Sequence, residues 1–139
     1  MSAVRAVILC ALVVTGCAPT SPPATFTEVY AAMFPLHTPG QCNYCHNRPP
    51  NDLSNGMLDT GDTRAAAYAA LVGPRSTSAM CGGDGYALVV PGSPETSLLY
   101  LKVAGSPPCG DPMPQGGSAL PEAQVEMIRS WIAAGAHDD

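Results

Sequence analysis

The sequence has little charge. Only 12% of its 139 residues are Asp, Glu, Lys or Arg, and the formal net charge is −5. A nucleic-acid-binding domain needs a basic face, so this balance argues against nucleic acid as a partner. The chain also has no internal repeat and no nucleotide-binding glycine motif, and its length suits a single domain.

No apolar run is long enough to cross a bilayer as a helix. The longest amino-terminal run, residues 6–14, follows Arg5 and leads into the letters VTGC, which begin at Val14 and end at Cys17. A spanning helix needs about 20 apolar residues. A short apolar run with small residues before a cysteine resembles the lipobox of bacterial lipoproteins, which implies cleavage before Cys17 and acylation of that residue. The alternative is an ordinary secretory signal, but no clear cleavage site of that kind is present.

This segment divides the chain into three parts. Residues 1–16 are predicted to be a lipoprotein signal peptide, residues 17–24 a lipidated Cys with a Pro/Ser/Thr tether, and residues 25–139 the folded domain. Several acyl chains would anchor the protein stably to a membrane. Ala18 supplies no acidic retention signal after Cys17. We therefore expect a lipid-anchored protein of the cell envelope, with the outer membrane favoured and the domain in the periplasm or outside the cell.

Cysteine is the most informative residue type in the domain. Cys42 and Cys45 belong to the segment CNYCH, which ends at His46, and Cys81 and Cys109 lie further on. Because export leads to an oxidising compartment, we expect a disulfide between Cys81 and Cys109. It would close a loop of roughly 30 residues and contribute about 3–4 kcal/mol in the loop-entropy picture.

Proline and glycine are abundant, with 15 and 14 residues, and they predict short helices joined by long loops. Thr25 and Glu28 have the spacing of a helix capping box. The predicted fold class is all-α. Four helices are expected. The first begins at Thr25 and ends near Pro35, and the second covers residues 64–72. The third runs from Ser93 to Gly105, and the fourth from Pro121 to Gly135.

The spacing C-x-x-C-H is that of covalent haem attachment. Two cysteines three positions apart can reach both vinyl groups on one porphyrin edge, and the next residue, His46, then projects under the iron. A zinc site would need a second pair of ligands with matching spacing, which is missing. A thioredoxin-like pair would need a βαβ context, which is also missing. We therefore expect one covalent haem c on Cys42 and Cys45, with His46 as the proximal iron ligand.

The distal iron ligand is expected to be Met113, which stands between two prolines that limit the entropy lost on fixing it. Met57 and Met80, in loops, remain candidates. Met33 has the position of a core-packing residue, and Met127, on the last helix, is expected either to pack or to be exposed. His37 and His137 are rivals that we expect to face solvent.

These features resemble class I mono-haem cytochromes c. The segments VPGSP from Val90, SLLY from Ser97, MPQGG from Met113 and the closing segment around Trp131 are similar to a cytochrome-c-like domain common in bacterial lipoproteins, over roughly residues 25–137. The resemblance implies a small cytochrome c-like fold around one haem, with haem on the CNYCH cysteines and Met113 as the distal ligand. It also implies that the first and last helices cross, with Val29 or Tyr30 near Trp131.

The expected function is single-electron transfer by a carrier that is not an enzyme. His/Met ligation fills both axial positions of the iron and raises its potential. The expected partners are transient redox proteins and, through the lipid, a membrane, with no nucleic acid and no small-molecule substrate. Two alternatives stay open: a haem-free, disulfide-bonded structural lipoprotein, and a haem-containing subunit of an oxidase or peroxidase.

Overall fold

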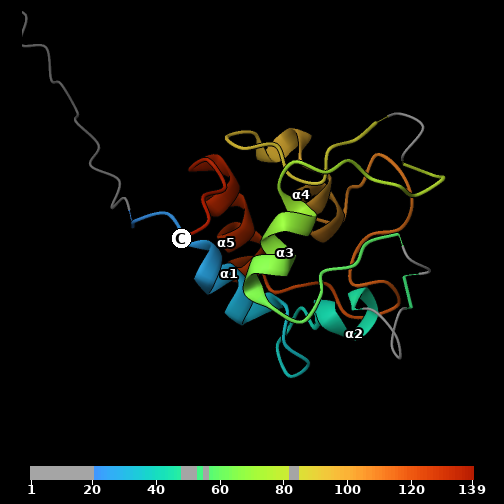
Figure 1. Ribbon diagram of the computed structural model, residues 1–139, viewed down its shortest axis with the longest axis horizontal. Helices are drawn as coiled ribbons and strands as arrows, with labels where there is room; N and C mark the ends of the chain where they lie inside the picture. The colour runs from blue at the N-terminus through green and yellow to red at the C-terminus, as the bar shows by residue number, and fades with distance from the viewer. Residues whose placement is uncertain (1–20, 48–52, 55–56, 82–84) are drawn as a thin grey trace, which may run out of the picture.

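The computed structural model describes residues 21–47, 53–54, 57–81 and 85–139. The predicted signal peptide and Cys17 lie outside these residues, and the tether is described only from Ser21 onward. The fold is helical, as expected, and within the described ranges extended pairing is limited to single bridges of Val72 with Val89 and of Arg75 with Ala87. The helices, drawn in Figure 1, are α1 (Phe26–Met33), α2 (Cys42–His46), α3 (Arg64–Leu71), the 3₁₀ turn η1 (Pro94–Thr96), α4 (Leu98–Val103) and α5 (Glu122–Ala133).

The starts of α1 and α3 are capped by side chains. The Thr25 hydroxyl accepts from the backbone N–H of Glu28 at 3.2 Å, and the Glu28 carboxylate accepts from the N–H of Thr25 at 2.8 Å. The predicted capping box is therefore confirmed. Helix α3 begins in the same manner, because the Thr63 hydroxyl accepts from the N–H of Ala66.

The prediction of one continuous helix from Ser93 to Gly105 is wrong, because this segment forms two separate elements. Residues Pro94–Thr96 form a 3₁₀ turn, Ser97 is extended with ψ 116°, and α4 begins only at Leu98. The buried Ser97 hydroxyl accepts from the N–H of Val90 at 2.8 Å and lies 2.9 Å from the carbonyl oxygen of Ser93. A side chain that bonds to nearby backbone competes with the helical pattern, and here it interrupts the helix.

The core forms where α1 packs against α5. The rings of Phe26 and Trp131 have centroids 4.9 Å apart, and Tyr68 of α3 meets Phe26 edge-on at 5.2 Å. Aromatic pairs at such distances add to the stability gained from burial. The buried cluster consists of Phe26, Val29, Met33, Phe34, Ala67, Leu71, Val89, Val103, Leu120, Ile128, Trp131, Ile132 and Ala136.

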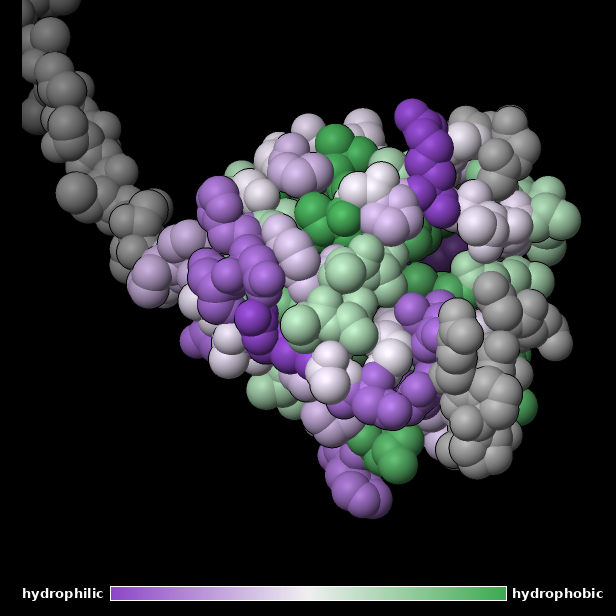
Figure 2. All heavy atoms as spheres, viewed as in Figure 1, coloured by the Kyte–Doolittle hydropathy of each residue, from purple (hydrophilic) through white to green (hydrophobic). Residues whose placement is uncertain are grey.

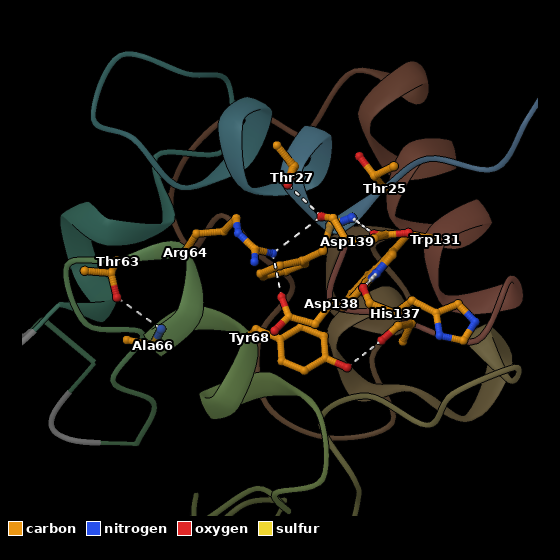
Figure 3. Close-up of polar contacts among 12 residues, drawn as sticks. Thr25, Thr27, Thr63, Arg64, Ala66, Tyr68, Trp131, His137, Asp138 and Asp139 are labelled. Carbon is orange, nitrogen blue, oxygen red and sulfur yellow. Dashed lines mark hydrogen bonds and ion pairs between the residues drawn. The ribbon is translucent and has the colours of Figure 1, made fainter.

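The end of the chain folds back onto the start of α1 (Figure 3). The Asp139 carboxylate accepts from the N–H of Phe26 at 2.8 Å, and its backbone oxygen accepts from the N–H of Thr27 at 3.0 Å. A negative side chain at a helix amino terminus satisfies unpaired N–H groups and interacts favourably with the helix dipole. Arg64 of α3 adds an ion pair with Asp138.

The same segment is fixed to the core by two side-chain donors, one on the buried Trp131 and one on the half-buried Tyr68. The Trp131 indole N–H donates to the carbonyl of His137 at 3.0 Å, and the Tyr68 hydroxyl donates to the carbonyl of Ala136 at 2.9 Å. Ala65 and Ala69 of α3 are exposed, and the surface in the middle of the face viewed in Figure 2 is pale green, that is, weakly apolar. Among the described residues, no helix has the length and apolar character needed to span a bilayer.

Replacing Phe26 by Leu should lower the free energy of unfolding by about 2 kcal/mol, because the aromatic contacts with Trp131 and Tyr68 are lost and the site is poorly refilled. Chemical denaturation followed by circular dichroism measures this change. Leu36→Ala, at an exposed position, should change it by less than about 0.5 kcal/mol. Equal effects of the two substitutions would contradict a core centred on Phe26.

Candidate functional site

The C-x-x-C-H segment forms the single-turn helix α2. Gln41, directly before it, has a left-handed backbone with φ 45°, which reverses the chain into the helix. The N–H of Asn43 donates to the carbonyl of Phe34 at 3.1 Å. The amino end of α2 is therefore fastened to the end of α1, and its place depends on the α1–α5 core.

The carboxyl end of α2 is held by Thr60. This residue is 1% exposed, and both its N–H and its hydroxyl lie 2.7 Å from the carbonyl oxygen of His46. The same hydroxyl is 3.0 Å from the amide oxygen of Asn43. Buried polar groups need partners of this kind, so the polar segment after α2 serves to fix the helix.

The imidazole of His46 is oriented by its Nδ1 atom, which lies 3.2 Å from the carbonyl oxygen of Leu58. A carbonyl can only accept, so Nδ1 carries the proton in the neutral ring. Nε2 is then the basic nitrogen. Metal-binding histidines usually have this arrangement, in which a hydrogen bond at one nitrogen fixes the tautomer and raises the basicity of the other.

The two motif thiols are not joined to each other, and both residues are partly buried. Burial raises the pKa of the Cys42 thiol to about 12, partly offset by a backbone hydrogen bond. At neutral pH the Cys42 sulfur is therefore uncharged, which suits its position against the hydrophobic core. The surroundings of this sulfur would accept a neutral thioether as readily as a neutral thiol.

Met113 lies on the loop between α4 and α5. Its N–H donates to the carbonyl of Lys102 at 2.9 Å. The half-buried side chain packs against the hydrophobic core that Cys42 also borders. It lines an open pocket of about 430 Å³ with Val103 from α4 and Val125 from α5. In Figure 1 the orange loop carrying Met113 curves around the side of the molecule on which α2 lies.

The other ligand candidates have different surroundings. Met33 is fully buried in the core, whereas Met57 and Met80 are 46% and 67% exposed. Met127 packs partly buried against the core. Both His37 and His137 are exposed. The expected packing of Met33 and the solvent positions of both histidines are thus observed.

Cys81 and Cys109 form a disulfide with Cα atoms 5.4 Å apart, as expected from the cysteine count. The bond links the turn before Tyr86 to the loop that carries Met113. Among the described residues, no three His, Cys, Asp or Glu side chains come together as a metal site.

Two contacts that build the site could not be found from sequence motifs. Thr60 and the Leu58 carbonyl lie in a polar, turn-rich stretch that gives no periodic signal.

Comparison with models of protein families, with curated proteins and with solved structures gives no match for this chain.

Replacing Thr60 by Val should lower the free energy of unfolding by about 1–2 kcal/mol, because the volume is kept while Asn43 loses its buried donor. Urea denaturation measures the change. Thr77→Val is the matched control, since its hydroxyl bonds to the Met57 carbonyl at an exposed position, and it should cost less than about 0.5 kcal/mol. A Thr60 variant as stable as the parent would show that α2 does not depend on this residue.

Proposed function

We propose that this protein is a lipid-anchored mono-haem c-type cytochrome that transfers single electrons in the cell envelope, with a cytochrome c-like fold. The observation that carries the proposal is the geometry of α2. Two unbridged thiols lie on one helical turn, and the next residue, His46, has its Nδ1 atom on the Leu58 carbonyl. This is the donor set that a covalently attached haem needs.

The residues present fit haem c. Cys42 and Cys45 would hold it through thioether bonds, His46 Nε2 would be the proximal ligand, and the Met113 sulfur would be the distal ligand. When bound, haem supplies a one-electron iron couple. The hydrogen bond from His46 Nδ1 strengthens the ligating nitrogen, and the Met113 thioether favours the ferrous state, which raises the potential.

Electron transfer is favoured over catalysis because this chain offers two residues, His46 and Met113, that would both hold the iron. With both bound, the iron would be closed to oxygen and peroxide. Met113 is suited to this role because it is only half-buried and borders the same core as Cys42. The acidic net charge of −5 suits docking patches on redox partners that are basic or weakly charged.

A reduced c-type visible spectrum that carbon monoxide leaves unchanged is the expected result for the holoprotein, produced with haem-maturation machinery. Met113→Ala should open the iron and allow carbon monoxide to bind. Met80→Ala is the matched control, because Met80 is exposed, and it should keep the resistance of the parent.

Two outcomes would overturn the proposal. A carbon monoxide shift in the parent would indicate an open iron site and a catalytic or sensory protein. Absence of covalent haem would leave a haem-free structural lipoprotein.

The lipid anchor is proposed from the sequence alone, and it has its own test. Cys17→Ser should abolish incorporation of labelled palmitate and shift the protein from the membrane fraction to the aqueous phase of a detergent partition. Cys10→Ser, which changes a residue of the predicted signal peptide, should leave labelling unchanged. Continued labelling of the Cys17 variant would refute the anchor without affecting the haem proposal.

A further inference from the structure

Lys102, on α4, is the only lysine of the chain. Its ammonium donates to two backbone carbonyls of the Met113 loop, that of Cys109 at 3.0 Å and that of Asp111 at 2.8 Å. Charge-assisted hydrogen bonds of this kind are stronger than those between neutral groups. The single ammonium group therefore bridges the helix and two points of the loop.

The backbone of the same residue makes a third connection, because the Lys102 carbonyl accepts from the N–H of Met113 at 2.9 Å. One residue thus contacts positions 109, 111 and 113 of the loop. The ammonium also fits closely against the turn between them, since a Cβ atom on Gly110 would lie 3.1 Å from Lys102 Nζ.

The loop depends on outside partners for its shape. Residues 106–114 include four prolines, which lack an N–H and so cannot donate to backbone carbonyls. Cys109 is also tied to Cys81 by the disulfide, and the Asp111 carboxylate accepts from the Gln115 amide at 2.7 Å. Over residues 109–113, Lys102 ties the loop to α4.

We propose that Lys102 is a positioning residue that holds Met113 where it can ligate the haem iron. This inference rests on the proposed function. Without the ammonium group, the carbonyls of Cys109 and Asp111 lose their common donor. The loop then spends less time in the position from which Met113 can ligate the iron. An added ligand that competes with Met113 reports this directly, because its apparent affinity follows the fraction of open iron.

The test measures imidazole binding to the ferric full-length holoprotein. Lys102→Met keeps the apolar stem but removes the donors, and it should tighten imidazole binding about tenfold. Lys102→Arg keeps the charge and several donors, so it should stay within about threefold of the parent. Arg129→Met is the matched loss of a cation, because Arg129 pairs with Glu126 on the exposed side of α5, and it should change nothing.

If the Lys102→Met variant does not fold, a second measurement replaces it. Because Lys102 is the only lysine, acetylation of the folded parent with an active ester, checked by mass mapping, removes the same charge and should give the same tighter binding. Unchanged imidazole affinity in the variant or in the acetylated protein, with the thermal midpoint lowered or not, would overturn the positioning role.

The experiment separates this inference from the function on which it rests. If the parent carries no haem, or if Met113→Ala binds imidazole no more tightly than the parent, then ligation by Met113 is wrong and the role of Lys102 falls with it. If Met113→Ala binds more tightly and Lys102→Met does not, only the inference about Lys102 is overturned.

Discussion

The packing of Phe26 against Trp131 joins the first helix to the last, and the position of the site follows from it. Phe34, at the end of α1, packs edge-on against Phe26 with centroids 6.3 Å apart. The Phe34 carbonyl in turn holds the N–H of Asn43 in α2. A small domain has few buried side chains with which to fix a functional group, and here one aromatic contact joins the first and last helices, which in turn hold the motif between them.

The motif itself is too short to hold its own shape. A single helical turn leaves most of its backbone groups without helical partners, so α2 needs support from elsewhere. That support comes from the following segment, through Thr60 at the carboxyl end of the helix and the Leu58 carbonyl at the imidazole. Leu58 and Thr60, between α2 and α3, thus form part of the site.

Much of the fold could be predicted where local chemistry decides the structure. The capping box at Thr25 and the Cys81–Cys109 pair each depend on residue type and spacing, and each is present. The single helix expected from Ser93 is wrong because the Ser97 side chain bonds to the backbone of Ser93 and Val90, a local competition that the helix-start pattern does not show. The roles of Thr60 and Lys102 could not be predicted, because their partners are backbone carbonyls, which leave no pattern in the sequence.

The described chain begins on the side of the molecule opposite to α2. Residues 21–25 reach α1 on the side where the final residues also lie, whereas α2 is at the opposite side of the molecule in Figure 1. The N–H of Ala24 is tied to the Ser130 hydroxyl of α5 at 3.2 Å, so the described chain is already fixed to the body before α1 begins. A lipid on Cys17 would sit only a short stretch of chain before this pole. If Cys17 carries the proposed lipid, the domain is attached at the side opposite to α2, so the proposed electron exchange would take place away from the point of attachment.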